Sequence, residues 1–559
     1  MKQGLISEAQ IDVSVRRLFT IRYRLGMFDP PSMVKYANVS ASTLEAPEHK
    51  ALALKMAQQS IVLLKNAGNT LPLNKNSIKK IAVIGPNADN RVAVLGNYNG
   101  IPSQIVTVLD GIKEKLGANT EVVYEKGTTF INDTLLVYAD VSRQFNWNGK
   151  QGFKAEYFNN RDLQGNPVST LTEASIEHAW QEGQAVIGNI VATNFSARYT
   201  SDFTATADGS ITFEVDGDDG YRLNINGKDV INTWLRNRMG ARTFKLQTKK
   251  DSVYRLTLEY FQGAGKANIS LRAGNFDRTD YLSLTNRVKD ADVILYVGGI
   301  SPQLEGEEMP VNATGFNGGD RTTIQLPAIQ TEMMKALHAT GKPVAFIMMT
   351  GSAIATPWES ENLPAIINAW YGGQSAGTAI ADVLFGDYNP AGRLPVTFYK
   401  TEKDLPGFSD YSMKGRTYRY FNGDALYPFG FGLSYSSFNY SGANIPATLK
   451  KGQNLVVTCT ITNTGKRDGE EVAQLYLAYQ KIPERAPLKA LKGFKRIFLK
   501  AGESTKISFT LNPEQLSLVD INGKMYQPSG KLSVSVGGGQ PGVKNKTTSN
   551  VLIKTLTIQ

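Results

Sequence analysis

The sequence predicts a multidomain protein in which an α/β sandwich carries an inserted β-sandwich and is followed by a second, C-terminal β-sandwich. The chain has 559 residues, too many for a single hydrophobic core. Strand and helix patterns alternate before and after residues 152–272, whereas that stretch contains only short alternating strands with polar turns. From residue 435 onwards the pattern is again that of strands alone.

A helical pattern opens the chain. It begins at Ser7, a favourable N-cap, and its apolar positions recur at helical spacing: Ile11, Val15, Leu18 and Phe19. A glycine and two prolines at 26–31 predict its end. The N-terminus reaches polar residues at once and lacks the apolar core of a signal peptide. We therefore expect the chain to begin in the middle of a larger protein.

The α/β part is predicted in two blocks. The first contains helices near 46–60 and 108–115 and strands at 61–66, 80–86 and 121–125. The second resumes near residue 290, with strands at 291–298, 343–349 and 365–369 and helices at 329–339 and 375–385. Strands that alternate with helices predict a parallel sheet. Because this rhythm is interrupted and then resumes, we interpret the all-β stretch between the blocks as a domain inserted at an exposed loop.

Composition narrows the function classes. The formal net charge is +11, but no Lys/Arg block is interleaved with aromatic residues, so we interpret the basic residues as a solvated surface rather than a nucleic-acid face. The single cysteine, Cys459, excludes disulfides within the chain, and its alternating surroundings predict a buried, inert residue. The histidines show no metal-ligand spacing, and the apolar runs are too short to span a bilayer.

Four segments, in this order, resemble the C-terminal region of glycoside hydrolase family 3. They are Ser-Ile-Val-Leu-Leu-Lys-Asn at 60–66, Ile-Gly-Pro-Asn-Ala-Asp at 84–89, Ala-Trp-Tyr-Gly-Gly-Gln at 369–374 with the run on to 395, and Arg-Thr-Tyr-Arg-Tyr-Phe at 416–421 with the run on to 435. The insert resembles the protective-antigen-type, lectin-like β-sandwich of some members, in Ala-Glu-Tyr-Phe at 155–158 and Asp-Asp-Gly-Tyr at 218–221. The resemblance covers nearly the whole chain.

The resemblance implies a plan of domains. Residues 1–35 would be the last helix of a barrel and its linker, 36–149 and 276–399 the two parts of the α/β sandwich, 150–275 the insert, 400–434 a connector, and 435–559 an immunoglobulin/fibronectin type III-like domain. Enzymes of the family begin with a (β/α)8-type barrel that carries a nucleophilic aspartate. The sequence has no matching segment, so we expect the barrel to come from the same or another chain.

The resemblance also points to a catalytic loop. In the family the acid/base residue commonly lies in a pattern like Glu-x-Glu-Gly-x-Asp-Arg, and here such a loop follows the predicted strand that ends near 298, at the carboxyl edge of the sheet. Glu307 matches the second glutamate and is the predicted acid/base. Glu305 and Glu308 are alternatives, because extra residues separate these glutamates from the Asp-Arg pair. Clustered glutamates raise one another's affinity for a proton, as a general acid requires; a solvated acidic loop is the other interpretation.

Two further pairs have two interpretations each. Asp320 and Arg321 are predicted either to form an ion pair that holds the loop or to contact substrate. Asp218 and Asp219 resemble the calcium-binding aspartate pair of sugar-binding relatives, and a turn between two strands is the alternative.

The expected function is part of a retaining, exo-acting β-glycosidase that removes terminal glucose or xylose from oligosaccharides, with no cofactor or metal. The insert is expected to project over the mouth of the active site and to limit the length of the bound sugar. The expected partners are an oligosaccharide or glycoside and the barrel, with no nucleic acid and no membrane. A periplasmic or secreted location is expected if a signal peptide precedes the barrel. Because the nucleophile domain is missing, the alternative is a non-catalytic carbohydrate-binding or scaffold protein.

Overall fold

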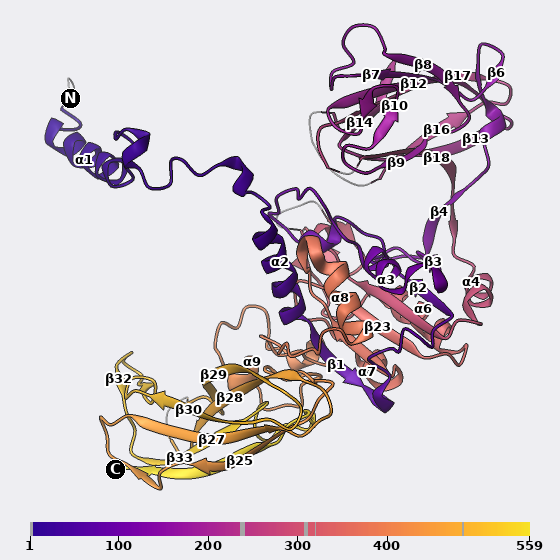
Figure 1. Cartoon of the computed structure of the whole chain (residues 1–559). Coiled ribbons are helices and arrows are strands. Elements are labelled where there is room, and N and C mark those ends of the chain that lie inside the picture. Colours follow the sequence, from indigo (N-terminus) through magenta and orange to yellow (C-terminus); the bar gives the residue numbers. More distant parts are fainter. Residues whose placement is uncertain (1–3, 235–240, 266, 307–310, 319, 483–485) are drawn as a thin grey trace. The chain divides into compact units, whose positions relative to one another are not determined.

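The structure, a computed structural model, describes residues 4–234, 241–265, 267–306, 311–318, 320–482 and 486–559 (Figure 1). The chain divides into two compact units, Met1–Leu52 and Ala53–Gln559. In the first unit, helix α1 (Glu8–Arg24) begins as predicted with a capping box, in which the Gln10 N–H donates to Ser7 Oγ and the Ser7 N–H donates to Gln10 Oε1. No described residue of α1 is buried. Leu18 and Phe19 are 54% and 40% exposed.

The second unit contains a sheet with strand order β1-β24-β23-β19-β2-β3. Its strands are β1 (Val62–Asn66), β2 (Lys80–Ile84), β3 (Glu121–Glu125), β19 (Val293–Gly299), β23 (Val344–Met349) and β24 (Ala365–Asn368). Neighbours from β24 to β3 run parallel, as predicted. The prediction of a purely parallel sheet is wrong for β1, which pairs antiparallel with β24. Antiparallel edge strands are common on otherwise parallel sheets.

Helices cover both faces of this sheet. They are α2 (Pro47–Ser60), α3 (Val108–Leu116), α4 (Tyr281–Val288), α6 (Ala328–His338), α7 (Pro357–Asn362) and α8 (Ala376–Phe385). In β2, Ile81 and Val83 pack into one hydrophobic cluster with α3 and α8, whereas Ala82 and Ile84 pack into a second cluster with α4 and α6. Strand side chains alternate between faces, so one strand supplies both cores. A Cβ on Gly111 would lie 2.2 Å from the Gly377 carbonyl oxygen, which shows how closely α3 approaches α8.

Residues 134–278 lie between the two blocks of this sheet in the chain and form antiparallel sheets of their own. One sheet has the order β15-β14-β17-β12-β5-β6, with β7 and β8 joined through β12, and the other has the order β16-β13-β18-β4, with β9 beside β18. Side chains of both sheets, among them Phe145, Tyr199, Phe213 and Tyr260, form one separate hydrophobic cluster. The strands are β4 (Thr134–Tyr138), β5 (Phe145–Trp147), β6 (Lys150–Gln151), β7 (Phe153–Phe158), β8 (Ser169–Glu173), β9 (Glu177–Trp180), β12 (Phe195–Thr204), β13 (Gly209–Asp218), β14 (Gly220–Ile225), β15 (Lys228–Asn232), β16 (Arg242–Thr248), β17 (Val253–Gln262) and β18 (Ala267–Arg278).

The C-terminal part consists of sheets with the orders β25-β27-β30 and β26-β34-β33-β28-β29, which share one hydrophobic cluster. The strands are β25 (Phe438–Asn444), β26 (Thr448–Leu449), β27 (Leu455–Asn463), β28 (Gly469–Tyr479), β29 (Ala490–Leu499), β30 (Ser504–Leu511), β33 (Gly530–Gly537) and β34 (Val551–Ile558). Cys459 lies in β27, is buried in that cluster, and burial raises the pKa of its thiol to about 11. The prediction that Cys459 is buried in a core is confirmed.

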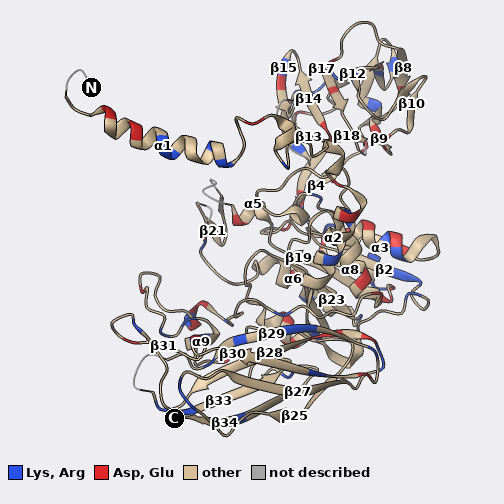
Figure 2. Cartoon of the chain, turned by 60° about the vertical axis from the view of Figure 1, so that its left-hand side comes forward, with Lys and Arg blue, Asp and Glu red and all other residues tan. Residues whose placement is uncertain are grey.

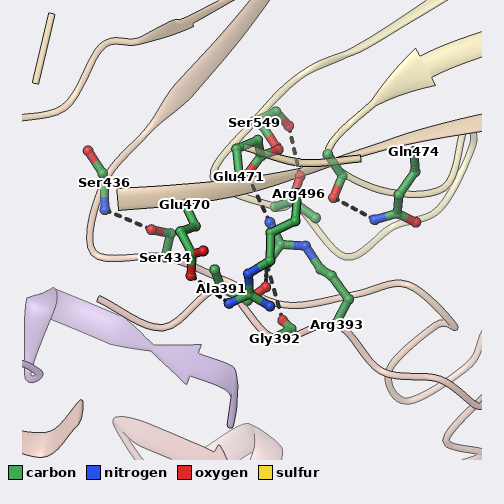
Figure 3. Close-up of polar contacts among 12 residues, drawn as sticks. Ala391, Gly392, Arg393, Ser434, Ser436, Glu470, Glu471, Gln474, Arg496 and Ser549 are labelled. Carbon is green, nitrogen blue, oxygen red and sulfur yellow. Dashed lines mark hydrogen bonds and ion pairs between the residues drawn. The ribbon is translucent and has the colours of Figure 1, made fainter. Parts of the chain in front are cut away.

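A polar joint connects the α/β part with the C-terminal part (Figure 3). Glu471 of β28 is fully buried and accepts hydrogen bonds from Arg393 Nη2 (2.9 Å), Tyr440 Oη (2.9 Å) and Ser549 Oγ (3.0 Å). Beside it, Arg496 Nη2 of β29 donates to Glu470 Oε2 at 2.8 Å. We call these contacts the interdomain joint.

Lysines and arginines are spread over helices and strands along the chain and are interspersed with acidic residues (Figure 2). Within the described residues, no helix is both long and apolar enough to cross a membrane.

Candidate active site

The candidate site lies at the carboxyl edge of the parallel sheet. The chain leaves β19 at Gly299, β23 at Met349 and β24 at Asn368, and each strand is followed directly by a loop. These strands are neighbours and run in the same direction, so the three loops meet at one edge. This edge is where open α/β sheets gather functional groups.

Glu305 ends a short helix, α5 (Pro302–Glu305), in the loop after β19. Ser301 caps this helix, with its Oγ accepting from the Leu304 N–H at 3.3 Å, and Pro302 occupies the first helical position. The helix stops at Gly306, whose φ is +21°. The local sequence therefore sets the position of Glu305 and turns the chain immediately after it.

Three donors from the two neighbouring loops hold the Glu305 carboxylate. Ser352 Oγ donates to Oε1 at 2.5 Å, and Tyr371 Oη and the Gly351 N–H donate to Oε2 at 2.6 and 3.1 Å. Both carboxylate oxygens thus have partners within the protein. We call Glu305, Gly351, Ser352 and Tyr371 the glutamate clamp.

The clamp leaves little room around its members. A Cβ on Gly351 would lie 2.7 Å from Glu305 Oε2, so a glycine at this position lets the backbone N–H reach the carboxylate. Burial raises the pKa of Tyr371, and the negative charge of Glu305 raises it further, so the phenol stays a donor. The clamp is therefore a fixed point to which the loop after β19 is attached.

Arg321 lies beside the clamp. Its Nη1 donates to Ser352 Oγ at 3.0 Å and to the Ala353 carbonyl at 2.9 Å. Burial lowers the pKa of Arg321, and Glu305 opposes this effect. Its Nη2 is buried and has no hydrogen-bond partner within the described residues.

The predicted ion pair between Asp320 and Arg321 is not formed in the part of the chain that the structure describes, where Arg321 has no carboxylate within ion-pair distance. The two residues form β22 (Asp320–Arg321), in which Asp320 is exposed and Arg321 is partly buried. Adjacent residues of a strand point to opposite faces, which separates the two side chains.

The connector contributes a second anchor through Glu402. Its carboxylate accepts from the Thr323 hydroxyl, the Ile324 N–H at 2.8 Å and Gln325 Nε2 at 3.2 Å. Burial alone would raise the pKa of Glu402, but these hydrogen bonds outweigh it and lower the pKa to about 2. Glu402 therefore holds residues 323–325, which follow Arg321 directly.

Of the five predicted site residues, the structure brings Glu305 and Arg321 together around Ser352, and it places Asp320 at the surface next to them. Glu307 and Glu308 lie outside the described residues. Ser352 and Tyr371 were not among the predicted site residues. Their positions could have marked them as site residues, because both follow predicted buried strands of the parallel sheet, as Glu305 does.

Asp218 and Asp219 lie at the junction where β13 ends and β14 begins. Arg91 Nη2 is 3.3 Å from Asp218 Oδ2, and the Gly263 N–H donates to Asp219 Oδ2 at 2.7 Å. Burial raises the pKa of Asp218 to about 6, although Arg91 opposes the shift. No group of three acidic, histidine or cysteine side chains that could hold a metal ion occurs among the described residues.

Comparison with known proteins defines the class to which this fold belongs. The model of the Glycosyl hydrolase family 3 C-terminal domain matches residues 61–435, and that of a fibronectin type III-like domain matches residues 471–540. The first match covers more than half of the chain. The chain therefore belongs to glycosyl hydrolase family 3.

Two curated relatives and one solved structure show how far the similarity extends. A xylan 1,4-beta-xylosidase of Xylanibacter ruminicola is 40% identical over 96% of this chain and 62% of its own length. A periplasmic beta-glucosidase of Salmonella typhimurium is 28% identical over 97% of this chain and 56% of its own length. A beta-glucosidase of Kluyveromyces marxianus, solved in complex with glucose, shares the fold with a TM-score of 0.61 and 24% identity, over 92% of this chain and 63% of that one. The chain thus spans less than two thirds of the length of each.

Proposed function

We propose that this chain is part of a retaining, exo-acting β-glycosidase and supplies its acid/base residue, Glu307. The glutamate clamp carries the proposal. Both oxygens of Glu305 are engaged by protein donors, so this carboxylate positions the loop. Glu307 follows it by two residues, beyond the turn at Gly306, in the position of the second glutamate of the family pattern. The clamp thus fixes the chain directly before the proposed acid/base.

The second carboxylate of a retaining enzyme forms the glycosyl–enzyme intermediate and must lie about 5 Å from the acid/base. We propose that a barrel domain, from the same or another polypeptide, provides this nucleophile. Two observations support a further domain. The chain spans 62% of the length of the relative from Xylanibacter ruminicola. Helix α1 also exposes apolar side chains, including Leu18 and Phe19, of the kind that pack against another domain.

For the substrate we propose terminal β-linked xylose in preference to glucose, because the relative with 40% identity is named a xylan 1,4-beta-xylosidase. Partly buried Arg321, beside the clamp, and exposed Asp320 next to it are the proposed substrate contacts. No cofactor is proposed, since glycoside hydrolysis by two carboxyl groups needs none. A periplasmic or secreted location fits the name of the Salmonella relative.

We further propose that residues 134–278 are an inserted, lectin-like β-sandwich of the protective-antigen type that limits the length of the bound sugar. Their separate hydrophobic cluster supports independent packing. Similarity to the Kluyveromyces beta-glucosidase covers 92% of the chain, and the uncovered 8% is too short to contain this whole region. The limits of the domains stay predictions.

The test compares the chain alone with the chain joined to the part of the Xylanibacter relative that it does not span, where the proposed barrel would lie. We expect negligible hydrolysis of an aryl β-xyloside by the chain alone, because the residue that forms the covalent intermediate is missing. Joining the barrel should restore turnover. Robust turnover by a rigorously purified preparation of the chain alone would contradict the proposal, and so would a folded, xylose-binding fusion that stays inactive.

A further inference from the structure

A cavity of about 300 Å³ lies where the connector meets the C-terminal β-sandwich. It is lined on one side by Arg419 and Tyr420 of helix α9 (Thr417–Tyr420), and on the other by residues of β28 and β29. The Leu488 N–H donates to the Arg419 carbonyl at 2.7 Å, so the connector is tied to the chain just before β29. The volume is at the lower end of the range of pockets that bind small molecules. We call it the connector cavity.

Two cationic side chains line the connector cavity. Lys492 of β29 is partly buried, and Arg419 is exposed. Within the described residues neither head group has a hydrogen bond or an ion pair, and the Arg419 guanidinium contacts only the ring of Tyr420, at 5.9 Å from its centroid. Burial lowers the pKa of Lys492, and the positive charge of Arg419 lowers it further. The described wall thus brings together two positive charges that have no partner in it.

Both cations are accessible. The polar atoms of the described residues that are fully buried and lack a partner include Arg393 Nε, but they do not include Lys492 Nζ, so the ammonium group keeps accessible surface. Arg419 is an exposed residue. Glu514 also lines the described wall, but it is exposed and forms no ion pair with either cation. A ligand in the cavity can therefore contact both cations directly.

The rest of the wall decides which kind of anion fits. Two of its hydroxyl groups are occupied by the main chain, since Tyr479 donates to the Leu516 carbonyl and Ser517 donates to the Pro513 carbonyl. The remaining side chains are largely apolar and include Leu477, Leu518, Val519 and Met525. Lysine and arginine only donate, and their strongest partners are charged oxygens such as those of a carboxylate. Two positive charges beside one exposed carboxylate are balanced by a single further negative charge, and the apolar wall favours a ligand with an apolar body.

We propose that the connector cavity binds a small organic anion, a monocarboxylate with an apolar body. The carboxylate of the ligand accepts from the Lys492 ammonium and the Arg419 guanidinium, and its apolar body packs on the aliphatic wall. The bound anion joins the connector, through Arg419, to β29, through Lys492. This site shares no residue with the glutamate clamp, and the proposal does not rest on the proposed glycosidase function.

The experiment titrates the intact chain with benzoate in an isothermal titration calorimeter. Benzamide, which has the same shape without the charge, and acetate, which has the carboxylate with hardly any apolar body, are the matched probes. We expect saturable binding of benzoate. Benzamide should bind at least about tenfold more weakly, because it offers no charged oxygens to the two cations, and acetate should bind more weakly than benzoate because it buries less apolar surface.

Matched variants assign the binding to this cavity. Lys492→Gln should weaken benzoate binding at least about tenfold, and Arg419→Gln, at an exposed position, provides the same test should the first variant fold poorly. Lys495→Gln removes an exposed charge of the same strand that lies outside the described wall and over the ring of Phe509, and it should bind like the wild type. The proposal would be overturned by a lack of saturable benzoate binding, by equal affinity for benzamide, by unchanged affinity in both Lys492→Gln and Arg419→Gln, or by an equal loss in Lys495→Gln.

Discussion

Glu305 and Glu471 each accept three hydrogen bonds from the protein, yet their surroundings differ in one decisive respect. Around Glu471 one donor is an arginine, and the carboxylate is completely buried. Around Glu305 the donors are a phenol, a hydroxyl and a backbone N–H, the carboxylate is partly exposed, and the arginine beside it bonds to Ser352 instead. An arginine thus contacts the carboxylate directly at the first site, whereas at the second Arg321 reaches it only through Ser352.

This difference separates a structural glutamate from a positioning one. A buried carboxylate with a paired arginine has no capacity left for a ligand, and removing it leaves an unpaired charge. Glu305 is held by neutral donors from two other loops, so it attaches the end of α5 to the edge of the sheet.

The largest expected effect is at the interdomain joint. Glu471→Gln should destabilise the protein by about 3–5 kcal/mol, because it leaves the buried guanidinium of Arg393 without a countercharge. Urea unfolding measured by circular dichroism would give this value. As a matched control, Glu470→Gln should cost only about 1 kcal/mol, since Glu470 and Arg496 remain 21% and 27% exposed. Equal losses of unfolding free energy in the two variants would contradict the distinction between a buried and a partly exposed ion pair.

A third carboxylate, Asp218, extends the comparison. Burial raises its pKa by more than the neighbouring Arg91 lowers it. Its pKa of about 6 in the folded protein exceeds the 3.8 of an ordinary aspartate. The folded state therefore binds more protons between these values, and the free energy of unfolding falls as the pH rises from about 4 to about 6. The expected fall is about 2–3 kcal/mol.

Asp218→Asn should remove this fall, because a neutral amide carries no penalty for buried charge. Thermal unfolding followed from pH 4 to pH 7 would show it. A fall of the same size in the variant would mean that another group causes the pH dependence.

The smallest effects come from single hydroxyl groups at the two glutamates. Tyr440→Phe removes one donor from fully buried Glu471 and should cost about 1.5–3 kcal/mol. Tyr371→Phe removes the equivalent donor from Glu305 and should cost about 0.5–1.5 kcal/mol, because water can replace it. Denaturant unfolding of both variants tests the order. The reverse order would show that the clamp is the more tightly sealed site.

Much of the fold followed from periodicity in the sequence. The strands of the parallel sheet are continuous apolar runs, and the capped start of α1 has a clear local signature, so both could be predicted. The direction of β1 could not, because an edge strand carries the same apolar pattern in either direction. The clamp could not be predicted from the sequence, because Ser352 and Tyr371 reach Glu305 only through the order of strands β19, β23 and β24 in the sheet.

The central claim is that Glu307 is the proton donor and Glu305 its support. In the chain joined to a barrel, Glu307→Gln should slow hydrolysis of xylosides with poor leaving groups by about 10²–10⁴-fold, and activated aryl xylosides far less. Azide should rescue turnover of the activated substrates, because a small anion attacks the glycosyl–enzyme without a base. Glu305→Gln should slow both substrate types alike and gain nothing from azide, and Glu308→Gln should resemble the wild type. The account would be contradicted if Glu307→Gln behaved like the wild type while Glu305→Gln or Glu308→Gln showed the dependence on leaving group.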